Sequence, residues 1–264
     1  MRQGVMFVAA VTLWAALGAG SATAGDTPQE ARLWTYAQGI GLLSPSWAIS
    51  VMPGLRWEVY DSEGPAGNAV MAELFVGPIF IQHFGPLTLK IPLWYYYMGF
   101  PLEKAGEPDD YWDSHNLELI PILEYRLGRW TFVSRTILHN KLYANNALFK
   151  TEKQRRGYSL LWRQLFRASY AVLPILDVTL AEEFFVGVVE DGETNGIEKG
   201  EPFFEKHGLS MNRVYAGVTM KLAKGMTLSP QYILETHLDP DHGEELTRIR
   251  HYLFLTWSYA FKLF

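Results

Sequence analysis

The chain ends in the segment TRIRHYLFLTWSYAFKLF (residues 247–264), whose pattern indicates the fold class. Apolar and aromatic side chains dominate its odd positions, and the basic side chains Arg248, Arg250 and Lys262 stand at even positions. Alternation with a period of two predicts a β-strand, because successive side chains of a strand point to opposite faces. A last strand of this length leaves an open sheet edge unless it pairs with the first strand. The segment therefore predicts an all-β protein formed by a single antiparallel transmembrane β-barrel.

The same alternation recurs along the chain from Trp47 onward. It predicts ten strands, at residues 47–60, 69–84, 87–100, 115–127, 130–143, 157–173, 175–189, 209–222, 226–238 and 247–264. Short turns are predicted at Pro45, Gly85, Gly128, Pro174 and Gly225, and longer polar loops begin near Asp61, Pro101, Ala144, Glu190 and Asp239. Short periplasmic turns and longer extracellular loops are typical of outer-membrane barrels.

The segment before Trp47 poses a problem of parity. Residues 32–43 look extended, but a strand there would start on the outer side, whereas the mature N-terminus is released on the periplasmic side. We therefore expect ten strands, with residues 25–45 lying in the periplasm or in the lumen. A barrel of twelve strands, with one strand overlooked, is the alternative.

The N-terminus has the features of a cleaved secretory signal peptide at residues 1–24. Arg2 supplies the positive charge, residues 5–17 form the apolar core, and Ala22-Thr23-Ala24 is a small-residue cleavage pattern. A single anchoring helix is the alternative, although its apolar core would be short. Residues 25–264 then form the barrel domain, and the expected location is the outer membrane of a Gram-negative bacterium.

Composition narrows the class of protein. The 264 residues include no cysteine, 14% are aromatic, and the formal net charge is −5. Basic residues do not gather in one run, so no nucleic-acid partner is expected. A mean hydropathy near zero is too polar for a bundle of membrane helices. The expected partners are outer-membrane lipid, the barrel-assembly machinery through the C-terminal strand, and a small solute.

The charges on the polar faces of the strands favour a membrane barrel, because charges of both signs can pair across strands in a lumen. The predicted lumen-lining charges are Arg56, Glu58, Glu118, Glu124, Arg126, Arg135, His139, Arg163, Arg167, Asp177, Glu183, Arg213, Glu235, Arg248 and Arg250. Tryptophan and tyrosine near strand ends suit two interfacial girdles. The competing interpretation is a secreted soluble β-sandwich or a lipocalin-like barrel.

Several short motifs resemble an uncharacterised family of bacterial outer-membrane barrels. They are Asn212-Arg213 followed by Gly217, the run Glu182-Glu183-Phe184, the arginine-bearing segment 157–173, and Trp34. The resemblance covers most of the mature chain and implies an outer-membrane barrel comparable in size to small nutrient porins, without an assigned activity. One departure concerns the C-terminal signal, since Trp257, Tyr259 and Phe261 are out of phase with Phe264.

The sequence gives little sign of an enzyme. A barrel lipase would need His and Ser two residues apart on one strand face, and no His-x-Ser occurs. The cluster His237, Asp239, Asp241 and His242 could serve an omptin-like protease or bind a divalent cation, but a solvated acidic turn explains it as well. No cofactor is expected.

Two groups of charges allow a functional and a structural interpretation. Arg135, His139 and Lys141 share one strand face, either as an anion-attracting stripe or as partners of Glu118 and Glu124 on the preceding strand. For a second group, Arg163 and Arg167 are predicted to face the lumen and to pair with acids such as Glu183.

Three functions remain open from sequence. The leading hypothesis is a narrow channel or binding protein for a small solute that uses the charged lumen. The first rival is a structural or surface-binding barrel closed by its own salt bridges. The second is an enzyme at the barrel rim that acts on lipid or peptide.

Overall fold

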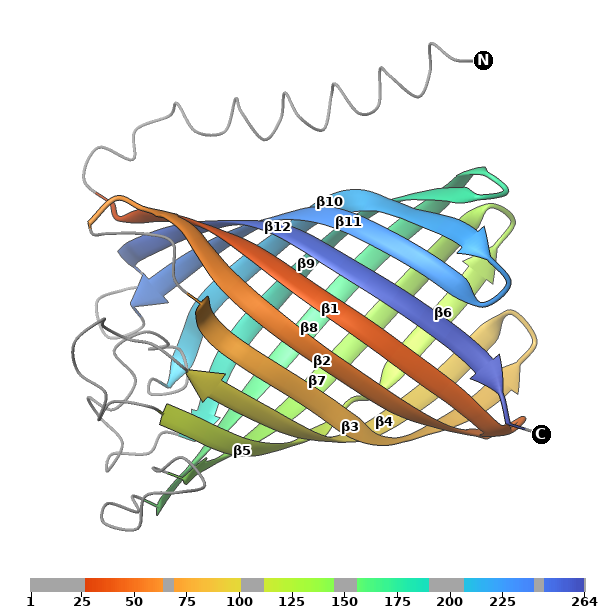
Figure 1. Cartoon of the computed structure of the whole chain (residues 1–264), viewed down its shortest axis with the longest axis horizontal. Helices are drawn as coiled ribbons and strands as arrows, with labels where there is room; N and C mark the ends of the chain where they lie inside the picture. Colours follow the sequence, from red (N-terminus) through yellow and green to blue (C-terminus); the bar gives the residue numbers. More distant parts are fainter. Residues whose placement is uncertain are drawn as a thin grey trace.

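The computed structural model describes residues 27–63, 69–100, 112–144, 156–189, 207–239 and 245–263, and these form an all-β barrel (Figure 1). The strands are β1 (Gln29–Ser44), β2 (Trp47–Asp61), β3 (Ala69–Phe84), β4 (Leu87–Phe100), β5 (Trp112–Leu119), β6 (Ile122–Leu127), β7 (Trp130–Ala144), β8 (Arg156–Leu173), β9 (Leu176–Val189), β10 (Gly208–Ala223), β11 (Met226–Asp239) and β12 (Glu245–Lys262). Among the described residues, no helix is long and apolar enough to cross a membrane. The predicted signal peptide, residues 1–24, lies outside the described ranges.

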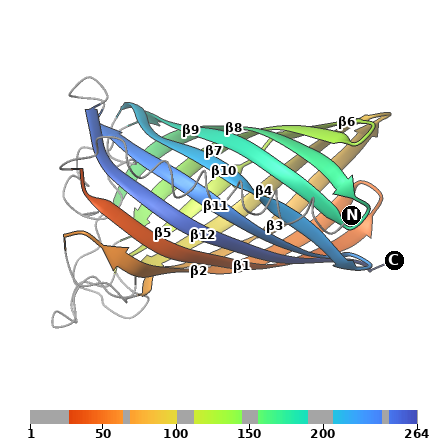
Figure 2. The same ribbon diagram turned by 90° about the horizontal axis from the view of Figure 1, so that it is seen from above.

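The wall closes on itself with eleven strand positions. Strands β5 and β6 each pair with both β4 and β7, so they lie end to end in one position of the wall and are separated at Ile120-Pro121. All other neighbours along the chain pair antiparallel, but β1 and β12 run parallel, with Gln29 opposite Ile249 and Leu42 opposite Lys262. A ring with an odd number of strands requires one parallel pair, and Figure 2 shows this seam.

The N-terminal segment therefore differs from the expectation. Gln29–Ser44 is a wall strand, not a periplasmic or luminal segment, and it adds one position to the ten predicted from Trp47 onward. The expectation failed because it assumed an antiparallel seam, which needs an even number. The alternation in the segment is in fact present, since Glu30, Arg32, Trp34 and Tyr36 all turn inward and are buried.

The turns follow the predicted alternation. The strands are joined by two-residue turns at Pro45-Ser46, Gly85-Pro86, Gly128-Arg129, Pro174-Ile175 and Lys224-Gly225, which lie together at one end of the barrel (Figure 1). Gly225 has a φ of 76°, and a Cβ built there would stand 2.1 Å from the carbonyl oxygen of Ala260. Both facts require glycine at this turn.

The polarity of the wall is inverted relative to a soluble protein. Large apolar side chains are exposed around the outside, as in Trp47, Ile49 and Val51 of β2 and Tyr158, Trp162 and Phe166 of β8. Charged side chains are instead buried in the interior. An apolar outside is compatible with the membrane interpretation, because a soluble barrel places its apolar face inside.

The parallel seam can be tested with cysteines, since the chain has none of its own. Gln38 and Ser258 are opposite each other across β1 and β12, and their side chains contact each other at 3.3 Å. We expect the double variant Gln38→Cys with Ser258→Cys to form a disulfide in the folded barrel, detected by electrophoresis after mild oxidation. The control pair Gln38→Cys with Lys262→Cys is displaced along β12 and should remain reduced. Equal cross-linking of both pairs would contradict the register.

Candidate functional site

The interior charges line the inner face of the wall, because strand alternation turns them all to the same side. We call this set of inward charges the layer. All fifteen predicted lumen-lining charges lie at inward positions: Arg56, Glu58, Glu118, Glu124, Arg126, Arg135, His139, Arg163, Arg167, Asp177, Glu183, Arg213, Glu235, Arg248 and Arg250. Arg126 is the least enclosed, with 70% of its side chain exposed near the short-turn end. Most of these charges belong to clusters that are centred on a glutamate.

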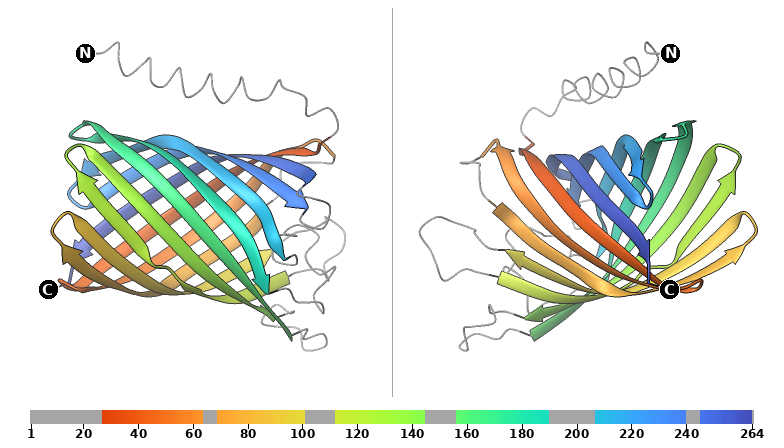
Figure 3. Two further views of the ribbon diagram at one scale, coloured as in Figure 1. Left: turned by 180° about the vertical axis from the view of Figure 1, so that it is seen from behind. Right: turned by 45° about the vertical axis from the view of Figure 1, so that its right-hand side comes forward.

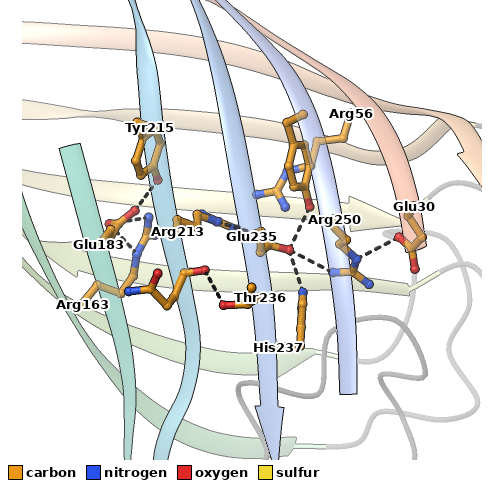
Figure 4. Close-up of polar contacts among 12 residues, drawn as sticks. Glu30, Arg56, Arg163, Glu183, Arg213, Tyr215, Glu235, Thr236, His237 and Arg250 are labelled. Carbon is orange, nitrogen blue, oxygen red and sulfur yellow. Dashed lines mark hydrogen bonds and ion pairs between the residues drawn. The ribbon is translucent and has the colours of Figure 1, made fainter. Parts of the chain in front are cut away.

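Glu235 on β11 is the centre of a cluster with four side-chain partners (Figure 4). It accepts hydrogen bonds from Arg213 on one side, and from Arg250 at 3.4 Å and Tyr252 at 3.0 Å on the other. The ring nitrogen Nε2 of His237 lies 2.7 Å from Oε1 of Glu235, the oxygen that also accepts from Arg250 and Tyr252. Glu235 and Arg250 are fully buried, so this carboxylate depends on protein partners alone.

Glu183 on β9 is the centre of a second cluster. Its Oε1 accepts from Arg163 at 3.0 Å and from Arg135 at 2.9 Å, and its Oε2 accepts from the hydroxyl of Tyr215. The carboxylate is fully buried. Figure 4 shows Arg163 and Tyr215 beside Glu183, and because Arg135 comes from β7, two strands away, the cluster connects the wall from β7 to β10.

A third cluster surrounds Glu73 on β3. The carboxylate accepts from Trp34 Nε1 and from the Tyr36 hydroxyl, both at 2.8 Å, and from the Tyr96 hydroxyl. Arg56 completes the shell at 3.1 Å. Three neutral donors and one cation thus satisfy a buried acid, which joins β1 to β4.

The parallel seam has its own ion pairs. Glu30 on β1 accepts from Arg250 Nε at 2.8 Å and from Arg248 at 2.6 Å on β12. Arg32 lies 2.8 Å from Glu30 and 3.6 Å from Glu58. Because Arg250 also reaches Glu235, the seam is connected to the cluster on β11.

Of the pairs predicted for Glu118 and Glu124, the structure has the one with His139 but not the one with Arg135. His139 lies 2.7 Å from Glu118 on the adjacent strand, as the structural interpretation predicted. Arg135 instead pairs with Glu183, and Glu124 pairs with Lys90 at 2.9 Å and with Arg126 at 2.6 Å. Asp177 pairs with Lys221 near the short turns at 2.9 Å.

Buried side chains from opposite sides of the wall, such as Tyr96 on β4 and Tyr215 on β10, belong to one packed cluster in the interior. The guanidinium of Arg213 on β10 lies 5.3 Å from the ring centre of Trp34 on β1, although β11 and β12 separate these strands in the wall. The same guanidinium lies 4.6 Å from the ring of Phe185, and Arg56 lies 3.9 Å from Trp34. These arginine–aromatic contacts close the interior at the level of the charged layer.

Arg167 differs from the prediction that it pairs with Glu183. It faces the interior from β8, but within the described part of the chain it makes no ion pair, and its Nε is buried without a hydrogen-bond acceptor. The Glu183 carboxylate instead accepts from Arg163, Arg135 and Tyr215. Arg163 does pair as predicted.

The predicted metal or protease cluster is not assembled by the described residues. No group of three His, Cys, Asp or Glu side chains suited to a metal ion occurs among them. His237 turns inward to Glu235, and Asp239 ends β11. Asp241 and His242 lie outside the described ranges.

Sequence reasoning overlooked several members of the layer. Glu30 and Arg32 belong to the segment that was expected outside the wall, and Tyr215 and Tyr252 are phenols that donate to carboxylates without standing out as charges. Their position in the alternation could have revealed them, because each of these residues has the same odd or even parity as the charged residues on its strand.

Comparison with protein families and with curated proteins finds no match to this sequence.

The dependence of the fold on these carboxylates can be measured by one matched pair of substitutions. Glu235→Gln leaves the buried Arg213 without its anion and removes one of the two acids that contact Arg250, so we expect it to lower the free energy of unfolding by about 3–5 kcal/mol. Glu124→Gln removes the same charge from the half-exposed Lys90 and the exposed Arg126, and should cost about 1 kcal/mol or less. Urea unfolding in lipid or detergent, followed by tryptophan fluorescence, measures both. Equal losses would contradict the assignment of the layer as the main stabilising element.

Proposed function

We propose that the protein is an outer-membrane β-barrel that its own ion pairs close at mid-height, and that it serves as a structural or surface-binding barrel through its longer loops. The observation that carries this proposal is an apolar outer face around an interior that is occupied by ion pairs and by one buried cluster of aromatic and apolar side chains. An apolar outside suits lipid, and paired charges inside need no water. The solute channel, which was the leading hypothesis from sequence, is less well supported, because buried side chains occupy the interior.

The dimensions of the wall support membrane insertion. The outward aromatics Tyr158 and Tyr170 bracket the exposed Trp162 and Phe166 on β8. A strand rise of about 3.3 Å per residue and a tilt of about 45° separate these tyrosines by about 28 Å along the barrel axis. That distance matches the thickness of an apolar band between two aromatic girdles.

Single-channel recording tests the closed interior. The refolded wild type in a planar bilayer should give no discrete openings, because the buried cluster and the adjoining contact between Trp34 and Arg213 fill the interior. The variant Trp34→Ala with Arg213→Ser removes this contact and should produce small steps of conductance. Lys221→Ser, near the short turns, is the control and should remain silent. Discrete openings from the wild type would overturn the closed-barrel proposal in favour of a channel.

Arg167 favours a second candidate function, the binding of a small anion in the half of the interior nearer the short turns. In the pairing register Arg167 lies opposite Val133, which makes it a diagonal neighbour of the inward Arg135. Of these two guanidinium groups, Arg135 pairs with Glu183. The Nε of Arg167 has no acceptor among the described residues. An anion between them would supply the missing acceptor.

Calorimetric titration of the refolded protein with inorganic phosphate tests this site. We expect saturable binding to the wild type and at least a tenfold weaker affinity for Arg167→Gln. The control Arg126→Gln changes an exposed arginine in the same half of the interior and should bind as the wild type does. Identical binding by Arg167→Gln would exclude this residue as the site, and absence of binding to the wild type would exclude the anion function itself.

A further inference from the structure

A row of polar side chains interrupts the apolar outer surface on β7 to β10. It consists of Ser134, Thr136, Gln164, Glu182 and Asn212, which all stand at outward positions. Thr136 donates to Gln164 Oε1 at 2.6 Å, and Gln164 Nε2 donates to Ser134 at 3.0 Å. Asn212 Nδ2 donates to Glu182 at 3.1 Å. We call these five residues the outer polar row.

The outer polar row lies at the middle of the wall, where hydrogen-bonding groups are most costly in a membrane. Gln164 stands halfway along β8, between the outward Trp162 and Phe166, and Glu182 stands halfway along β9. The left panel of Figure 3 shows this side of the barrel, which carries β7 to β9 toward the viewer. A carboxylate or amide facing acyl chains at this depth is unfavourable, and such residues commonly mark a functional contact.

Shape adds a second observation at the same place. Two grooves on the outside flank Phe166, which is 55% exposed and forms a ridge between them. One groove, of about 610 Å³, runs over Ala168, Leu180 and Glu182. The other, of about 470 Å³, runs over Gln164 and Phe184. The outer polar row, the Phe166 ridge and the two grooves therefore lie on the same part of the outer surface, which we call the patch.

We propose that this patch is an interface at which a second copy of the chain binds within the membrane, related to the first by a two-fold axis. Acyl chains offer no donors or acceptors, so the occupant must be protein. Gln164 Nε2 donates to Ser134 and to the carbonyl of Leu165, but Asn212 has a second amide hydrogen and Glu182 a second carboxylate oxygen, so these two residues can bond to their counterparts on a second copy. A two-fold contact places the same patch on both partners, and the Phe166 ridge of each copy enters a groove of the other. This inference rests on the proposed membrane location.

Small residues and charge complementarity support this occupant. Ala168 and Ala216 are outward on β8 and β10 and let two walls approach closely. Because the patch holds one carboxylate and two primary amides, an antiparallel arrangement can place Glu182 opposite amide donors of the partner and not opposite the other Glu182. The contact would then exchange an unfavourable exposure to lipid for hydrogen bonds between copies.

Cross-linking in vesicles tests the interface without removing it. The single variants Val214→Cys and Leu253→Cys replace outward residues, the first beside the patch on β10 and the second away from it on β12. A short bifunctional thiol reagent should give a covalent dimer of Val214→Cys in phosphatidylcholine vesicles at high dilution of protein in lipid. Leu253→Cys should give at least tenfold less dimer. Equal yields, or none from Val214→Cys, would overturn the proposed surface.

A second measurement separates this inference from the membrane proposal. The variant Gln164→Leu with Glu182→Leu makes the patch apolar, which suits lipid and leaves the interior layer untouched. We expect it to insert as the wild type does, shown by vesicle flotation, and its dimer dissociation constant to rise at least tenfold, measured by energy transfer between labelled copies. Inserted wild type that stays monomeric would overturn the interface alone, including the case in which another protein or lipid covers the patch. Wild type that fails to insert would overturn both proposals.

Discussion

The pairing of buried carboxylates with arginines and phenols is the constraint on which the rest of the barrel depends. Glu73, Glu183 and Glu235 are enclosed in the interior, and an uncompensated charge there would cost several kcal/mol. Each one therefore collects donors from more than one strand. Since these donors come from strands on both sides of the acid, charge compensation and closure of the wall become the same requirement.

The parallel seam illustrates this coupling. The backbone of β1 and β12 pairs in parallel, which is the less stable ladder per residue. Glu30 on β1 holds Arg248 and Arg250 on β12, and Arg250 extends the contact to Glu235 on β11. The weakest ladder of the wall is thus reinforced by the interior layer, and an eleventh strand becomes compatible with a closed ring.

The sequence predicted the wall better than its contents. Period-two alternation from Trp47 onward located the strands and turns, because a strand that is polar on one side only must show its phase. The seam could not be predicted, since Gln29–Ser44 alternates equally well in a wall strand paired either way. The sequence also could not predict which acid each interior arginine contacts. Arg163 and Arg167 are equally placed beside Glu183 in the register, and only the competition from Arg135 and Tyr215 decides between them.

Adjacent residues on β9 and β10 belong to the inner layer of charges and to the outer polar row, so the register of these strands decides the position of both. Glu183 and Arg213 turn inward and are opposite each other in the register, whereas their neighbours Glu182 and Asn212 turn outward and bond to each other. A slip of one residue would exchange these faces, but it would also expose Phe185 to the wrong side and leave the inner layer without its acid. The inner layer therefore fixes the register, and the outer pair cannot be relieved by a shift of the strand. At the proposed membrane location, a partner on the outside of the wall would reduce the cost of exposing this pair to lipid.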